Sequence, residues 1–180
     1  MYWKVITMFE GESNHRKRVE KLAVYQKAKA ITDLVIKLSE VIEDEIEKMP
    51  QTTEAEIAER TLQDMVGNAY LLPVKIAGAE AVDLYDLKME NAAIIRKAAR
   101  EISVACTGLK MFGIEQSLEY LQVLREEIEL FRVEFAEWVK TFDPWDYIID
   151  RWGLFNPPGV NYDDKDPDDD IPFNPDDIDL

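Results

Sequence analysis

Residues that could carry out catalysis are few in this chain of 180 amino acids. The sequence has one histidine, His15, and one cysteine, Cys106. A di-iron or di-manganese helical site needs Glu-x-x-His pairs on facing helices, and redox or zinc motifs need paired cysteines. Nucleophile-elbow, P-loop and glycine-rich dinucleotide motifs are also missing from the sequence. We therefore expect a protein that is not an enzyme, with no catalytic residues, no cofactor and no bound metal.

Aspartates near the C-terminus are the remaining candidates for metal chemistry. Asp164, Asp166 and Asp168 have the alternating spacing that opens an EF-hand calcium loop. The sixth position of such a loop requires glycine and the twelfth a bidentate glutamate, but Asp169 and Pro175 occupy these positions. A calcium loop is therefore not expected. A metal-assisted hydrolase that uses these aspartates stays open as the enzymatic alternative.

The most basic stretch is HRKRVEKLAVYQKAKA, residues 15–30. Clustered Lys and Arg side chains are what contacts with phosphates require. The candidate nucleic-acid contacts are Arg16, Lys17, Arg18, Lys21, Lys27 and Lys29. The whole chain has a net charge of −16, and residues 143–180 have a net charge of −10, which argues against nucleic-acid binding over the whole surface. Binding through residues 16–30, autoinhibited by the acidic tail, is the main alternative function.

A second candidate surface is the aromatic, acidic C-terminal segment. The run WDYIIDRWGLFNPPGV, residues 145–160, is too apolar to remain in water, so we expect it to pack on its own bundle or on a neighbouring subunit. Further on, DDDIPF is similar to the acidic tip of bacterial single-stranded-DNA-binding proteins, which docks into basic hydrophobic pockets of repair and replication enzymes. Carboxylates would steer this segment to a basic partner, in cis or in trans. The predicted docking residues are Trp145, Trp152, Phe155, Ile171 and Phe173.

Four long amphipathic helices are expected to carry these surfaces. Their predicted ranges are 16–49, 53 to about 80, 83–112, and from 114–117 to 142, each with an apolar seam in steps of three and four residues. Short connections favour antiparallel neighbours. The fold class is therefore all-α: an antiparallel up-down-up-down four-helix bundle over residues 16–142. Residues 1–15 are expected to form an extended N-terminal arm, and residues 143–180 an acidic, aromatic-rich C-terminal extension.

Local signals predict how these helices begin, bend and end. Thr53 and Glu56 have the spacing of a capping box at the start of the second helix. Pro73 removes one helical donor and is expected to kink that helix, while Gly113 is expected to stop the third. Asn91 falls on the seam of the third helix between Leu87 and Ile94, so we expect a buried polar residue that fixes the register.

The sequence also bears on the compartment. No apolar run approaches the about 20 residues that a membrane-spanning helix needs, and the first residues lack the order of charge, apolar stretch and cleavage site of a signal peptide. A single cysteine excludes an internal disulfide, which fits a reducing compartment. We expect a cytoplasmic protein without a membrane partner.

The run LLPVKIAGAEA, with DLYDLKMENAAIIRKAAREI after it, resembles the four-helix-bundle family related to the intervening-sequence protein of bacterial 23S ribosomal RNA genes. The same superfamily includes the accessory variability determinant of diversity-generating retroelements. Its second helix reads roughly Ile-Pro-x-Asn-Ile-Ala-Glu-Gly, which Pro73, Ile76 and Ala77 match. Asn, Glu and Gly of that motif are replaced here by Lys75, Gly78 and Ala79. The resemblance covers about residues 20–142.

This resemblance implies a barrel-shaped homo-oligomer, pentameric in the family, without catalytic residues. Accessory members of the family bind a reverse transcriptase and its nucleic acid through a basic surface. The leading hypothesis is therefore a non-enzymatic oligomeric adaptor or scaffold, an accessory factor of a reverse transcriptase or another basic nucleic-acid enzyme.

Overall fold

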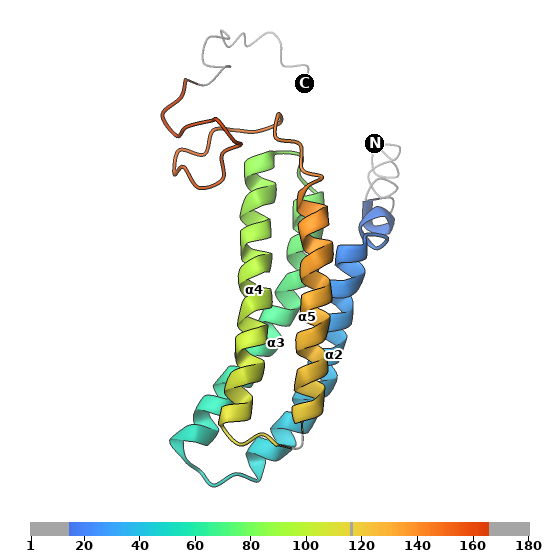
Figure 1. The fold of residues 1–180 in the computed structure, drawn as a ribbon, viewed down its shortest axis with the longest axis vertical. Helices are drawn as coiled ribbons and strands as arrows, with labels where there is room; N and C mark the ends of the chain where they lie inside the picture. Colours follow the sequence, from blue (N-terminus) through green and yellow to red (C-terminus); the bar gives the residue numbers. More distant parts are fainter. Residues whose placement is uncertain (1–14, 116, 166–180) are drawn as a thin grey trace, which may run out of the picture.

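The computed structural model describes residues 15–115 and 117–165 (Figure 1). This part of the chain contains helices and no β-strand. Residues 15–19 form a short helical segment, and four long helices follow: α2 (Ala23–Glu47), α3 (Thr53–Glu80), α4 (Tyr85–Met111) and α5 (Leu118–Val139). The predicted N-terminal arm, the DDDIPF segment and the docking residues Ile171 and Phe173 lie outside the described residues.

The four long helices pack around one apolar core. Helix α2 contacts α3 and α5, and α4 contacts the same two helices, more extensively on the α3 side (Figure 1). Complete burial of a large apolar side chain contributes about 1.5–3 kcal/mol, so a shared core of this kind is the main stabilising element. The largest fully buried side chains are Ile31, Ile42, Leu62, Met65, Leu72, Ile76, Ile95, Ile102, Leu109, Ile114, Leu124 and Phe131.

The first predicted helix is wrong in one respect: it is broken between residues 19 and 23. Leu22 has an extended backbone with φ −67° and ψ 130°, and α2 begins only at Ala23. In a straight helix of about 3.6 residues per turn, Leu22 would lie on nearly the opposite face from Val24, the first residue of the seam. Val19 is buried and Leu22 packs against the core, so the chain bends to place both side chains inside.

Apart from the start of α2, the helix ends lie within four residues of the predicted ones, and one cap is corrected. The largest difference is at α5, which was predicted to run to residue 142 and ends at Val139. The N-cap of α3 is Thr52 and not Thr53, since the Thr52 side chain accepts a hydrogen bond from the backbone N–H of Ala55 at 3.4 Å. Glu54 and Glu56 lie in the first turn of α3, where carboxylates favour the exposed N–H groups. Gly113 ends α4 in the left-handed conformation that was predicted, with φ 85°.

The predicted seam of the third helix is wrong in its first half. Leu87 is exposed and Asn91 and Ile94 are half-buried, whereas Ala92 and Ile95 lie in the core. The Asn91 amide donates within its own helix to the carbonyl of Leu87, at 2.9 Å. Its Oδ1 would lie 3.7 Å from a Cβ on Gly78, so Asn91 occupies the edge of the α3–α4 contact. It is therefore not the buried register-fixing residue that the sequence predicted.

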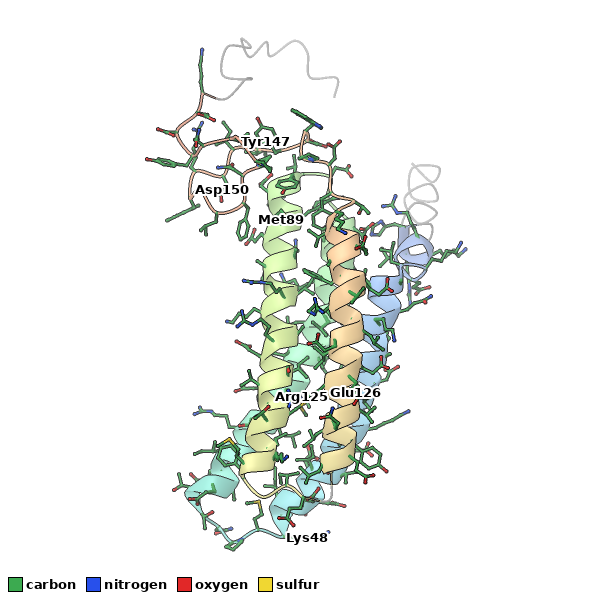
Figure 2. The ribbon with its side chains drawn as sticks, viewed as in Figure 1. Lys48, Met89, Arg125, Glu126, Tyr147 and Asp150 are labelled. Atoms are coloured by element: carbon green, nitrogen blue, oxygen red, sulfur yellow. The ribbon has the colours of Figure 1, made fainter. Side chains whose placement is uncertain are left out.

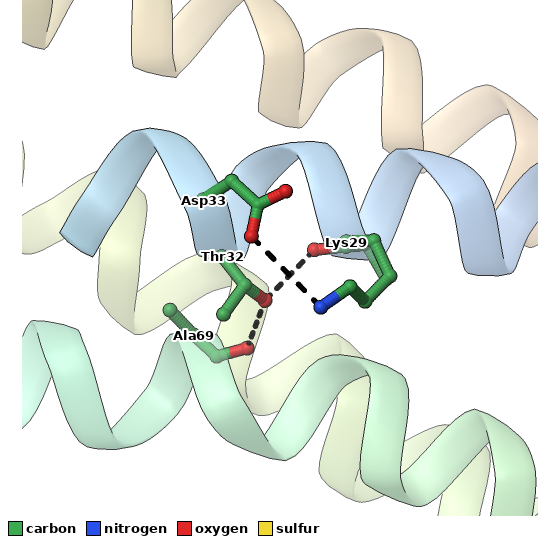
Figure 3. A network of polar contacts seen from close by, with 5 residues as sticks. Lys29, Thr32, Asp33 and Ala69 are labelled. Carbon is green, nitrogen blue, oxygen red and sulfur yellow. Dashed lines mark hydrogen bonds and ion pairs between the residues drawn. The ribbon is translucent and has the colours of Figure 1, made fainter. Parts of the chain in front are cut away.

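Pro73 lies buried inside α3, and its missing N–H is compensated by a neighbouring helix. In a regular helix the N–H of residue 73 would bond to the carbonyl of Ala69, and proline cannot donate this bond. The hydroxyl of Thr32 on α2 donates instead to the Ala69 oxygen at 2.9 Å, sharing its proton with the Ala28 oxygen, also at 2.9 Å (Figure 3). Thr32 is almost completely buried, so this bond pins α2 to α3 inside the core.

A second polar contact joins α2 to the start of α5. The Ser117 hydroxyl donates to a carboxylate oxygen of Glu45, and both residues are buried. Ser117 is the N-cap residue of α5 but makes no side-chain cap bond, because its hydroxyl is directed to Glu45. Every buried polar side-chain atom of the described residues has a hydrogen-bond partner. Thr32, Glu45 and Ser117 thus form hydrogen bonds that join one helix to another, while the buried Ser39 donates within α2 to Ile36.

We predict that Thr32→Val destabilises the fold by about 1–3 kcal/mol, because it leaves the Ala69 carbonyl buried without a donor. The same substitution in a Pro73→Ala background should cost clearly less, since an alanine at that position has a backbone N–H that bonds to the Ala69 oxygen. Chemical denaturation of the four proteins of this cycle measures the difference. Thr61→Val is the matched control, because the Thr61 hydroxyl donates within its own helix to Ile57. An equal loss in both backgrounds would contradict the compensation.

Candidate functional site

The two residues most often used in catalysis are not arranged as a reactive pair. His15 lies on the first helical segment, with Nδ1 3.3 Å from a nitrogen of Arg18. Cys106 is buried in α4, and burial raises the pKa of its thiol to about 11, although Arg125 opposes the shift. The thiol is therefore protonated at neutral pH and a poor nucleophile. Among residues 15–115 and 117–165 no three His, Cys, Asp or Glu side chains are grouped to hold a metal ion.

The six candidate nucleic-acid residues do not form one continuous surface. The bend at residues 20–22 separates Arg16, Lys17, Arg18 and Lys21 from Lys27 and Lys29 on α2. Four of the six also bond to acceptors inside the chain, at distances from 2.9 to 3.9 Å. These contacts are Arg16 with Glu20, Arg18 with the backbone oxygen of Glu80, Lys27 with Glu127, and Lys29 with Asp33. Lys17 and Lys21 are exposed and form no ion pair with another described residue.

The C-terminal loop, residues 143–165, is anchored to the start of α4 (Figures 1 and 2). The backbone oxygen of Asp146 accepts from the N–H of Tyr85 at 2.7 Å, and the N–H of Ile148 donates to a carboxylate oxygen of Asp86 at 3.1 Å. The N-cap residue of α4, Leu84, has no side chain that could satisfy the free N–H groups of the first turn. The backbone oxygen of Asp146 accepts from one of these N–H groups, that of Tyr85, and this hydrogen bond holds the loop against the start of α4.

Asp150 organises the middle of the C-terminal loop. Its two carboxylate oxygens accept from the N–H groups of Trp152, Leu154 and Phe155 at 2.8 to 2.9 Å. Its backbone N–H and oxygen bond to the amide of Asn156 at 2.7 and 2.9 Å. Figure 2 shows Asp150 and Tyr147 in the loop, beyond the end of α4 that carries Met89. One carboxylate therefore gathers three donors of a segment that has no regular secondary structure.

A second set of hydrogen bonds, formed by Arg151, joins the middle of the C-terminal loop to its last residues. The guanidinium of Arg151 donates to the backbone oxygens of Tyr162 and Asp164 at 2.9 and 2.7 Å. The carboxylate of Asp164 accepts from the N–H of Asn161 at 2.7 Å. Gly153 has φ 71°, and a Cβ there would meet Tyr162 at 3.5 Å, so the two passes of the chain lie against each other. The loop thus has a fixed shape of its own.

This fixed loop exposes large apolar side chains to solvent. Trp152 is 89% exposed, Trp145 88% and Leu154 74%, while Ile148 and Tyr162 are more than half exposed. Backbone groups of Asp146 and Ile148 bond to the start of α4 and Ile149 is buried, but the two tryptophans stay exposed. Phe155 is half-buried and contributes less surface than we expected. Exposed apolar side chains that gather on one loop are typical of protein-interaction surfaces, where aromatic residues dominate the binding energy.

Sequence reasoning found Trp145 and Trp152 but missed the residues that shape the loop around them. Asp150 and Asn156 were not singled out, although aspartate and asparagine before a run of turn residues commonly bond to nearby backbone N–H groups. Leu154 and Tyr162 were also missed as exposed surface.

Comparison with protein-family models, curated proteins and solved structures finds no match to this chain. No helix of the described residues is long and apolar enough to cross a lipid bilayer.

The Asp150 carboxyl gives the C-terminal loop a predictable response to acid. Partial burial is the largest single influence and by itself raises the pKa of Asp150, but the three backbone N–H bonds together lower the pKa below its ordinary value. Because the pKa is depressed in the folded loop, the stabilisation is complete above the ordinary pKa of about 4 and is lost as the pH falls through the depressed value.

We predict that the loop stays ordered at pH 4 and loosens only at lower pH, as measured by hydrogen exchange of residues 151–156. Asp150→Asn should loosen it at neutral pH, because an amide has one acceptor oxygen in place of two. Asp163→Asn is the matched control, since Asp163 is exposed and accepts no hydrogen bond from a described residue. Equal exchange in the two variants would show that Asp150 does not organise the loop.

Proposed function

We propose that this protein is a non-enzymatic, cytoplasmic, oligomeric adaptor, in which an antiparallel up-down-up-down bundle supports the C-terminal loop as a protein-docking surface. The observation that carries the proposal is the exposure of Trp145, Trp152 and Leu154 on a loop that Asp150 and Arg151 hold in shape. A preorganised aromatic surface loses little conformational entropy on binding, which favours its use in recognition.

The charge around the loop defines the kind of partner that fits. Residues 143–165 contain five aspartates against Arg151 and Lys165, and the last fifteen residues add seven aspartates and no base. The complementary surface therefore combines an apolar contact for the tryptophans with surrounding Lys and Arg side chains. Enzymes that bind nucleic acid have basic surfaces, so a reverse transcriptase or another enzyme of this class is a suitable partner, in line with the accessory role that the family resemblance implies.

Direct nucleic-acid binding is the second candidate function, and the exposed Lys17 and Lys21 favour it. The contacts of Arg16, Arg18, Lys27 and Lys29 within the chain weigh against it, because each would compete with a phosphate. For a metal-assisted hydrolase the support is weaker, since the Asp164 carboxylate already accepts from Asn161, and Asp166 and Asp168 lie outside the described residues.

We predict that a photoreactive benzoylphenylalanine at position 152 forms a discrete protein crosslink in the cells that naturally produce this chain. Position 111 is the control, because Met111 is 80% exposed at the opposite end of the bundle. Trp145→Ala should strongly weaken the crosslink from position 152, since it removes the other exposed tryptophan of the loop. Crosslinking of equal strength and pattern from positions 152 and 111 would refute the docking function.

We also predict that truncation after Lys165 uncovers no nucleic-acid binding, as measured by fluorescence anisotropy with single-stranded DNA and RNA at low salt. This end point keeps both acceptors of Arg151, so the loop stays intact. Salt-sensitive binding that Lys17→Ala and Lys21→Ala abolish would favour the second candidate function over the first.

A further inference from the structure

The C-terminal loop and the basic helical segment lie at the same end of the bundle, on opposite sides (Figure 1). We define the basic turn as residues 15–21. It is tied to the end of α3 through Arg18 and Glu80, while the loop is tied to the start of α4 through Tyr85 and Asp146. These anchors keep the two surfaces apart within one chain. Among the described residues, no hydrogen bond or ion pair joins the basic turn to the C-terminal loop.

The two surfaces have matching charges of opposite sign. The basic turn has a net charge of +3, from Arg16, Lys17, Arg18 and Lys21 against Glu20, and residues 143–165 have a net charge of −3. This match stands out in a chain of net charge −16, whose copies repel one another over most of their surface. The basic turn is therefore a place where a second copy can approach the acidic loop without like-charge repulsion.

The side chains on the two surfaces also fit one another chemically. Trp145 and Trp152 present nearly free indole rings, and Lys17 and Lys21 present ammonium groups without an acidic partner among the described residues. Ammonium and guanidinium groups are attracted to the face of an indole ring, and tryptophan is the best acceptor of this interaction. The aliphatic stems of Lys and Arg can cover the apolar surface that the loop leaves exposed.

From this arrangement we propose that the partner of the C-terminal loop is the basic turn of a second copy of the same chain. A twofold axis across this end of the bundle brings each loop against the basic turn of the other copy, so both surfaces are used twice and the dimer is closed. The inference rests on the proposed docking function of the loop and names its partner. The bundle sides and the opposite ends stay free in such a head-to-head dimer.

Charge reversal of each surface tests the pairing in the full-length chain. Lys17→Glu with Lys21→Glu makes the turn acidic, and Asp146→Lys with Asp163→Lys makes the loop basic, without removing a bond that holds either surface. Analytical ultracentrifugation at low salt should show a dimer for the unmodified chain. Each reversed variant alone should dimerise at least about tenfold more weakly, because both of its reciprocal contacts then bring like charges together.

Mixing the two reversed variants gives the decisive result. The acidic loop of the first variant meets the basic turn of the second, and its acidic turn meets the basic loop, so the mixture should form a heterodimer more strongly than either variant pairs with itself. Lys37→Glu with Lys48→Glu is the control for the turn reversal, because it makes the same change in net charge at exposed positions of α2 and its C-cap, away from this end of the bundle. This control should keep the dimer affinity of the unmodified chain.

The outcomes separate this inference from the proposed function. A chain that is monomeric at about 50 µM at low salt overturns the dimer, as does a dimer that neither reversal weakens. If position 152 crosslinks only to a different protein, the inference fails and the docking function stands. Crosslinks from position 152 to residues 15–21 of a second copy support both. If position 152 gives no discrete crosslink to any protein, both fail.

Discussion

Four helices that bury one shared apolar core impose the constraint on which the rest of this molecule depends. Burial of side chains such as Ile31, Met65, Ile102 and Phe131 stabilises the bundle, and it leaves little room for polar groups inside. The polar groups that are buried must then form hydrogen bonds, and most of them do so across helices. Thr32 does so for the carbonyl that Pro73 leaves without a donor, and Ser117 does so with Glu45.

The same constraint bears on where the proposed docking surface lies. The core holds most of the large apolar side chains of the helices, although Val74 and Val104 are exposed, and the C-terminal loop carries two tryptophans that lie outside the core. Because these apolar side chains are not buried, their burial cannot stabilise the loop, and its backbone must be fixed by other interactions. Asp150, Asn156 and Arg151 supply these interactions through hydrogen bonds to the loop backbone, which need no apolar burial.

Charge segregation gives that end of the molecule its character. The basic turn and the acidic loop are separated by more than a hundred residues in the sequence, and helix packing brings them to one end of the bundle. Surfaces of opposite sign at one end favour association of two copies there, while the acidic remainder of the surface limits association elsewhere. The proposed adaptor and the proposed dimer both follow from this distribution.

By itself, the sequence determined the helices and most of their buried residues, because a repeat of three and four residues is readable locally. Helix ends at Gly113 and near Glu80 were equally local. Only the tertiary structure decided the bend at Leu22, the displacement of Asn91 from the seam, and the role of Thr32, since each depends on what a neighbouring helix presents. The exposure of Trp145 and Trp152 could likewise not be predicted from the sequence, because a run of apolar residues predicts burial. The sequence pattern does not show that hydrogen bonds to the backbone can fix such a run while its side chains remain in contact with solvent.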